Sequence, residues 1–166
     1  ERECMDIRLT EEVPFSELTV RLNACLPRGL RALEAGEPVG KFEEIQYGEY
    51  EMALEGEDPA VLEEKVRSLL ERETVLVRKH TKKGDKDFDI KPDFANTRIV
   101  SQKDGLLLHL CLPCSVAGST NPSLLLEALK QYEGIEPFFQ ITRKRLLTKD
   151  FSEFREIILA FSSALC

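Results

Sequence analysis

Apolar residues recur along this chain with two different periods, and the order of those periods limits the fold. Tyr50, Met52 and Leu54 alternate with Glu49 and Glu51, which is typical of a strand with one buried face and predicts a strand over residues 45–54. Residues 58–72 begin with Asp58-Pro59 and continue with apolar residues at three- and four-residue spacing, which predicts a capped amphipathic helix. The complete pattern predicts strands near 5–9, 30–33, 45–54, 74–78, 88–90, 97–101, 106–112 and 138–147, and helices near 15–26, 58–72, 122–133 and 151–165.

This order predicts an α+β fold. If the strand pair at 88–90 and 97–101 is an insertion, the elements from 45 to 147 follow the order βαββαβ, which folds as an antiparallel sheet with its helices on one face. We therefore expect a ferredoxin-like domain with an inserted hairpin over residues 41–149. A partial βαβ unit over 1–40 precedes it, joined by the Gly/Pro-containing stretch 34–40, and a C-terminal amphipathic helix over 150–166 follows it, opened by the capping box Asp150–Glu153.

Composition limits the class of protein. The chain has 166 residues, 42% of them apolar and 32% charged, as in ordinary globular domains. It has no run of roughly 20 apolar residues, so we expect no membrane span. The five cysteines are odd in number and widely spaced, which does not indicate a disulfide framework and favours a reducing cytoplasm.

Charge is divided unevenly along the chain. The net charge is −7, yet residues 76–166 carry fourteen Lys and Arg against eleven Asp and Glu. An acidic chain does not favour non-specific nucleic-acid binding, but a local basic patch can still bind a phosphate at physiological salt. The alternative is a solvated hairpin whose charges serve solubility. The candidate RNA- or anion-binding residues are Arg78, Lys79, Lys82, Lys83, Lys86, Lys91, Arg143 and Arg145.

The motifs of common enzymes and metal sites are missing from the sequence. It has no GxSxG or HExxH motif and only two histidines. Cys111 and Cys114 form a single CxxC motif, and a closed zinc site needs four ligands, which His80 and His109 could complete. We therefore assign no catalytic residue, metal ligand or cofactor, and leave open whether the two cysteines bind a metal.

Several segments resemble one known family. The basic stretch Lys82-Lys83-Gly84 followed by Asp89-Ile90-Lys91-Pro92 is similar to the basic loop and "Asp-Ile-Arg-Pro" signature of the radical-SAM-linked domain of unknown function. Glu3–Leu9, Asn121–Leu125 and Ile141–Arg143 also resemble segments of that family, over roughly residues 3–148. Lys91 and Asn121 replace arginines that are usual in it, which weakens a bidentate anion role at both positions.

The resemblance implies a fold and a role. That family occurs fused to or beside cobalamin-binding radical SAM proteins, and its gene neighbourhood implies work on RNA. The family begins earlier, so residues 1–35 would be half of a second ferredoxin-like unit with an exposed sheet edge near Cys4–Leu9. We expect a non-catalytic accessory domain that presents RNA or another substrate to a radical SAM protein through its basic hairpin.

Two other functions stay open. One is a protein-interaction or dimerisation module that uses the apolar stripe of residues 151–165 or an exposed sheet edge. The other is an enzyme in which Asp87 or Asp89 acts as a base or metal ligand.

Overall fold

The computed structural model describes residues 5–56, 58–81 and 84–154, except the side chains of 79–81. Within these residues the chain forms two compact units that divide between Phe42 and Glu43.

The N-terminal unit contains one helix, α1 (Phe15–Cys25), as its apolar spacing predicted. Asn23, near the C-terminal end of α1, connects the helix to the segment that follows it. The side-chain amide of Asn23 donates to the carbonyl oxygen of Ala32 at 3.0 Å and accepts from the N–H of Ala32 at 2.9 Å. The strands expected at 5–9 and 30–33 are not formed. The prediction of a βαβ unit is therefore wrong in its strands: the alternating pattern has no partner strand in these residues, and Met5 and Leu30 remain 70% and 64% exposed.

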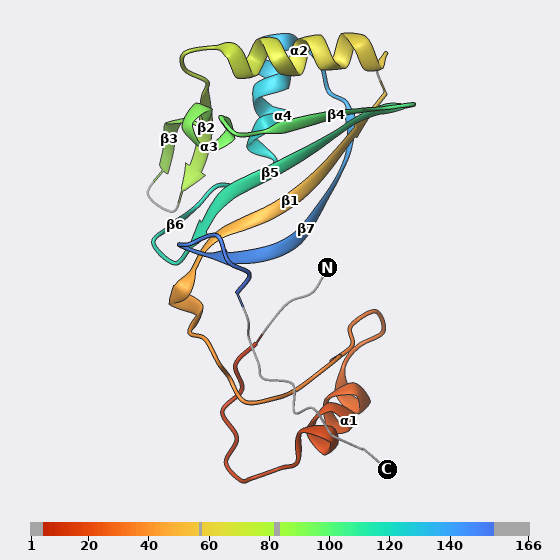
Figure 1. The fold of residues 1–166 in the computed structure, drawn as a ribbon, viewed down its shortest axis with the longest axis vertical. Helices are drawn as coiled ribbons and strands as arrows, with labels where there is room; N and C mark the ends of the chain where they lie inside the picture. The colour runs from red at the N-terminus through yellow and green to blue at the C-terminus, as the bar shows by residue number, and fades with distance from the viewer. Residues whose placement is uncertain (1–4, 57, 82–83, 155–166) are drawn as a thin grey trace. The chain divides into compact units, whose positions relative to one another are not determined.

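The second unit is built on a five-stranded antiparallel sheet, in which four core strands have the order β4-β5-β1-β7 and the short β6 pairs with β5 off this path. In chain order these are the second, third, first and fourth strands, which is the split βαββαβ arrangement that the sequence predicted. Two helices lie on one face of the sheet (Figure 1), so the predicted α+β fold is confirmed. The elements of this core are β1 (Ile45–Glu55), α2 (Pro59–Glu71), β4 (Arg98–Gln102), β5 (Gly105–Ser115), α4 (Leu124–Ala128), its π-helical continuation η2 (Leu129–Glu133) and β7 (Phe138–Thr148).

The inserted hairpin differs from the predicted one. The strands β2 (Leu76–Thr81) and β3 (Gly84–Asp89) pair with each other as a separate two-stranded sheet, and β4 is the second strand of the core. The expected insertion of 88–90 with 97–101 is wrong because β2 can close locally onto β3. In contrast, β4 pairs with β5 through a turn at Lys103-Asp104, with Gly105 as the first residue of β5. The short elements α3 (Lys91–Phe94) and β6 (Gly118–Ser119) complete the unit. The 3-10 helix η1 (Phe42–Glu44) spans the division between the two units.

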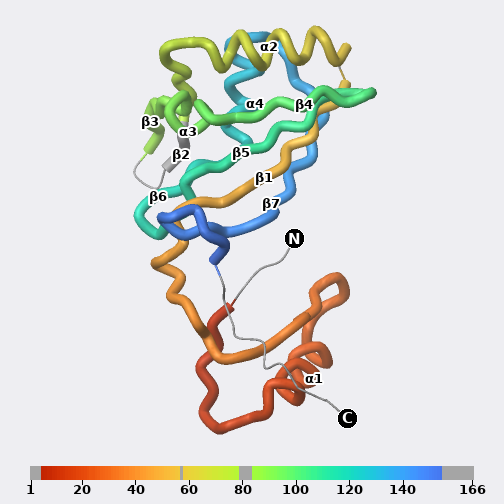
Figure 2. The backbone as a smooth tube through the Cα atoms, viewed as in Figure 1, coloured from red at the N-terminus to blue at the C-terminus, as the bar shows by residue number. Residues whose placement is uncertain are grey.

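The two helices and the sheet form two layers (Figure 2), and the core is made by buried apolar residues of both. Even-numbered residues of β1 and β5 point toward the helices because successive side chains on a strand alternate between faces. These residues, with the apolar stripes of α2 and α4, form one continuous cluster. Its largest fully buried side chains include Met52, Leu54, Leu62, Leu69, Ile90, Phe94, Leu106, Leu108, Leu112, Leu125 and Leu129. The opposite face of the sheet, here called the open face, carries the odd-numbered residues and no helix of this unit.

After β7 the chain does not enter a helix at Asp150. Phe151 has a φ of +58° and its ring stacks on Tyr47 with centroids 4.6 Å apart. Ser152–Phe154 then returns along the end of β7, where the N–H of Phe154 donates to the carbonyl oxygen of Leu146 at 2.8 Å. The helix predicted from the capping box is therefore wrong over residues 151–154, and the rest of that apolar stripe lies outside the described residues.

Candidate functional site

The basic hairpin β2–β3 stands apart from the main sheet. Its register places Lys79 directly opposite Lys86, while Asp85, Asp87 and Asp89 occupy the alternate positions of β3. Like charges in directly opposite positions of an antiparallel ladder are destabilising. One face of the hairpin therefore carries the opposed positions Lys79 and Lys86, and the other carries Arg78 opposite Asp87, together with Asp85 and Asp89.

The acids of the hairpin neutralise part of its charge. The guanidinium of Arg78 lies 3.2 Å from the carboxylate of Asp85, although its side chain is 72% exposed. Lys86 is exposed. Lys82 and Lys83, two further candidate anion ligands, lie outside the described residues, as does the side chain of Lys79.

Two residues at the base of the hairpin have structural contacts. The ammonium of Lys91 donates to the carbonyl oxygen of Leu70 at the end of α2. The carboxylate of Asp89 accepts from the N–H of Val75 at 2.9 Å and from the N–H of Lys91 at 3.0 Å. These bonds fasten the hairpin to the core, so Lys91 contributes to the fold and the Asp89 carboxylate is already occupied.

Arg143 and Arg145, which the sequence grouped as one basic cluster, lie on opposite faces of β7. Glu49 pairs with Arg145 and Tyr50 pairs with Arg143, so Lys144 is an extra residue in a β-bulge. Arg143 lies on the helix-covered face, and Arg145 on the open face. The structure therefore does not bring these two arginines together on one surface.

Arg143 belongs to a small cluster with Tyr50 and Cys114. Burial, and then the neighbouring Cys114 thiol, raise the pKa of Tyr50 to about 12, while the hydrogen-bonded guanidinium of Arg143 lowers it in part. The phenol of Tyr50 therefore stays neutral at any physiological pH. We infer that the guanidinium of Arg143 helps to hold the Tyr50 ring in place.

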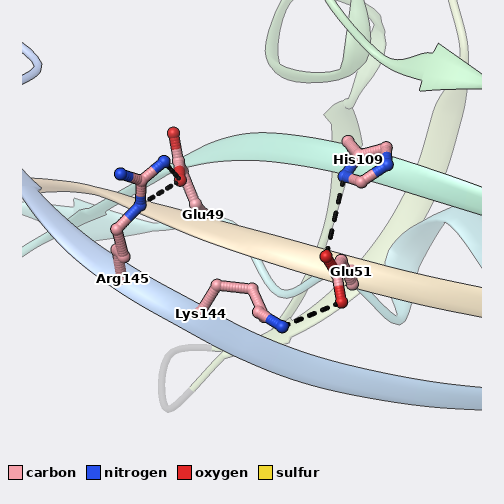
Figure 3. Close-up of polar contacts among 5 residues, drawn as sticks. All are labelled: Glu49, Glu51, His109, Lys144 and Arg145. Carbon is pink, nitrogen blue, oxygen red and sulfur yellow. Dashed lines mark hydrogen bonds and ion pairs between the residues drawn. The ribbon is translucent and has the colours of Figure 1, made fainter.

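The open face carries a network of ion pairs across β5, β1 and β7 (Figure 3). The guanidinium of Arg145 contacts the carboxylate of Glu49 at 2.6 Å. The carboxylate of Glu51 contacts the ammonium of Lys144 at 3.1 Å and lies 3.9 Å from Nδ1 of His109. The bulge makes this network possible, because it turns both Lys144 and Arg145 to the same face.

These side chains line a groove of about 520 Å³ that Asn96, Arg98 and Cys111 complete. Burial, and then the charge of Glu49, raise the pKa of the Cys111 thiol, so it is not activated as a nucleophile. Sequence reasoning did not select Glu49, Glu51 or Arg98. Their alternation with core residues was visible, but the cross-strand register that assembles them was not.

Cys111 and Cys114 do not form a metal site in the described residues. Cys111 lies on the open face and Cys114 beside Tyr50 on the covered face. The described part of the chain holds no cluster of three or more His, Cys, Asp or Glu side chains that could bind a metal ion. Its helices also lack the length and apolarity that a membrane crossing requires.

Comparison with known proteins places most of the chain in one family. Residues 1–122 match the family described as an uncharacterized protein conserved in bacteria (DUF2344). No curated protein and no solved structure matches the chain. The family match spans α1, the basic hairpin and three of the four core strands. The chain belongs to the DUF2344 family.

Proposed function

We propose that this protein is a non-catalytic accessory domain that binds RNA through the β2–β3 hairpin and presents it to a radical SAM enzyme. The register of the hairpin supports RNA binding. The resemblance of the Lys82–Pro92 segment to the radical-SAM-linked domain supports the choice of enzyme partner. The same resemblance supports a cytoplasmic location, where RNA is available.

The observation that carries the proposal is the direct opposition of Lys79 and Lys86. Two lysines opposite each other repel when no anion lies between them, and a phosphate would relieve that repulsion. Lys82 and Lys83 lie between them in the sequence, so the hairpin has four lysines within eight residues. A single phosphate needs fewer cations, whereas a nucleic-acid backbone offers one charge per nucleotide to such a row.

The contacts of the other charged residues support the hairpin as the binding element. Arg145 and Lys144 are paired with carboxylates on the open face, and Lys91 is bound to the backbone of α2. The carboxylate of Asp89 already accepts two backbone hydrogen bonds, which disfavours the alternative in which this residue acts as a catalytic base or metal ligand. The open face also lacks the aromatic side chains on which sheet-type RNA-binding domains stack bases, at its central positions Glu49, Glu51 and His109.

The test is a pair of double variants of the full chain. Lys79→Gln/Lys86→Gln removes the opposed lysines, and the matched control Lys103→Gln/Lys149→Gln removes two exposed lysines elsewhere in the same unit. Fluorescence anisotropy with labelled transfer RNA would give the dissociation constant between about 50 and 200 mM salt.

The hairpin variant should bind more weakly at every salt concentration. The slope of log affinity against log salt should fall by about 0.7–0.9 for each lost phosphate contact, and the control should keep the parent slope. Equal losses of RNA affinity in both variants would show that the change in net charge, and not the hairpin, causes the loss. Parent-like binding by the hairpin variant would overturn the proposal.

A further inference from the structure

The outer edge of β7 is uncovered along its first half. On its inner side β7 pairs with β1 along its whole length. On its outer side, the returning segment Ser152–Phe154 bonds to Leu146 and Thr148. Among the described residues, no strand pairs with the outer edge from 138 to 145.

This uncovered stretch lacks the features that usually protect an edge strand. Such edges are blunted by charged side chains, prolines, bulges or short length. The bulge at Lys144 and the two basic side chains beside it protect the second half of β7. Residues 138–142 carry no charge, and Phe138 and Phe139 are 79% and 56% exposed.

The bulge also determines which backbone groups point outward. The carbonyl of Leu146 and the N–H of Thr148 point away from β1, since both bond to the returning segment. The backbone groups of a strand alternate in direction, and the two residues of a bulge both point toward the partner strand. Lys144 and Arg145 of the bulge therefore both point toward β1, and alternation resumes before them. It follows that Phe139 and Ile141 direct their N–H and C=O groups outward, away from β1.

We infer that β7 pairs antiparallel with β7 of a second copy of this chain, in a register centred on Gln140. In this register Phe139 lies opposite Ile141 of the second copy, and each residue offers its outward N–H and C=O to the other. Phe138 then lies opposite Thr142 of the second copy, which gives pairs of aromatic with β-branched side chains on both faces of the ribbon.

The register places no like charges directly opposite each other. One step beyond the apolar pairs, Arg143 lies opposite Pro137 of the second copy, at the point where β7 begins. Glu136 and Lys144, the next position outward, are already paired within each copy, with Lys130 at 2.9 Å and with Glu51 at 3.1 Å.

The other edge of the core sheet fits a second copy less well. The edge strand β4 has only five residues and carries Arg98, with Lys103 in the turn that follows it. A contact of β7 with β4 of another copy would also be head-to-tail and could continue without closing. Pairing of β7 with itself closes after two copies.

The resulting dimer has one continuous sheet. A two-fold axis through the antiparallel ribbon is perpendicular to the sheet, so the helices of both copies cover one side and both open faces lie on the other. The grooves that Arg145 and Lys144 border then flank the axis. The ribbon is short, and we therefore expect a dimer whose population depends on protein concentration.

Sedimentation of the full chain tests the association. The weight-average mass should rise with concentration from 18.9 kDa toward twice that value. Phe139→Lys places a charge on the apolar edge and should raise the dimer dissociation constant at least tenfold. The control Val100→Lys makes the same change at an exposed position of β4 and should leave the constant unchanged.

A cross-link tests the register. Gln140 lies opposite itself in a non-hydrogen-bonded pair, where the Cα atoms are about 4.5 Å apart and can be bridged by a disulfide. Gln140→Cys should therefore form an intermolecular disulfide that peptide mass spectrometry locates at position 140, and Gln102→Cys on β4 should not. A monomer at all concentrations, equal effects of the two lysine variants, or no 140–140 cross-link would overturn the inference.

Discussion

The ring of Tyr50 lies over Gly48, two residues earlier on the same face of β1. A Cβ atom at Gly48 would lie 2.8 Å from both Cε2 and Oη of Tyr50, closer than any unstrained contact. The missing side chain thus gives the ring the space to reach Cys114 and Arg143. The Tyr50 ring on the same strand therefore requires glycine at position 48.

Substitution of Gly48 should show this dependence. Gly48→Ala should lower the free energy of unfolding by about 1–3 kcal/mol, because the Tyr50 ring must move in a packed site. Denaturant titration would measure the loss, and Gly118→Ala, which meets no atom within 4 Å, is the matched control. In the background Tyr50→Leu the cost of Gly48→Ala should shrink; an unchanged cost would remove the ring as its cause.

The aspartates of the hairpin should differ in their effects on stability. Asp89→Ala leaves the N–H groups of Val75 and Lys91 without their acceptor and should cost about 1–3 kcal/mol. Asp87→Ala changes an exposed position and should stay within about 0.5 kcal/mol of the parent. The comparison uses thermal or denaturant unfolding, and similar losses in the two variants would contradict the role given to Asp89.

Tyr50 should make the protein less stable at high pH. Its pKa is raised from 10.0 to about 12 in the folded state, so folding favours the neutral phenol. This contribution is complete below about pH 10 and is lost as the pH rises toward 12. We expect a loss on the order of 1–2 kcal/mol over this window, since Tyr50 is only half-buried. Tyr50→Phe should lack this component, and a phenol that ionises near pH 10 in ultraviolet titration would refute it.

The ion pairs of the open face should contribute little to stability. The side chains of Arg145 and Glu49 are 51% and 33% exposed, so solvent screens their attraction. A double-mutant cycle with Arg145→Gln and Glu49→Gln should give a coupling of about 0.2–1 kcal/mol that decreases with salt. A coupling that is unaffected by about 1 M salt would indicate a far more shielded pair.

Periodicity predicted the elements of the second unit because each of its core strands and helices buries one apolar face against the same core. It could not predict which strands pair. Residues 74–78 and 97–101 have equally good strand patterns, and only the tertiary contacts place the second of them beside β5. In the N-terminal unit the pattern at 5–9 looked like a strand, but a strand also needs a partner, and local sequence does not supply one.

The candidate site was also predicted only in part, because the sequence shows local segments and not the pairing of distant ones. The basic segment around Lys86 was found from composition, and β2 and β3 pair with each other because they are close in the sequence. The grouping of Arg143 with Arg145 assumed a regular strand, in which residues two apart lie on the same face. No residue type between them predicts the bulge at Lys144. The contact of Lys91 with the backbone of Leu70 joins residues 21 positions apart and has no sequence signal.

Lys144 has a consequence for how this chain tolerates shortening. Because Lys144 is the one unmatched residue between the halves of β7, its removal would leave Arg143 opposite Tyr50 and Arg145 opposite Glu49, as in a regular ladder. Ile141 would keep its place on the core, and the open face would lose the ammonium group that pairs with Glu51. The loss of this single codon would therefore leave both halves of the strand on their present faces.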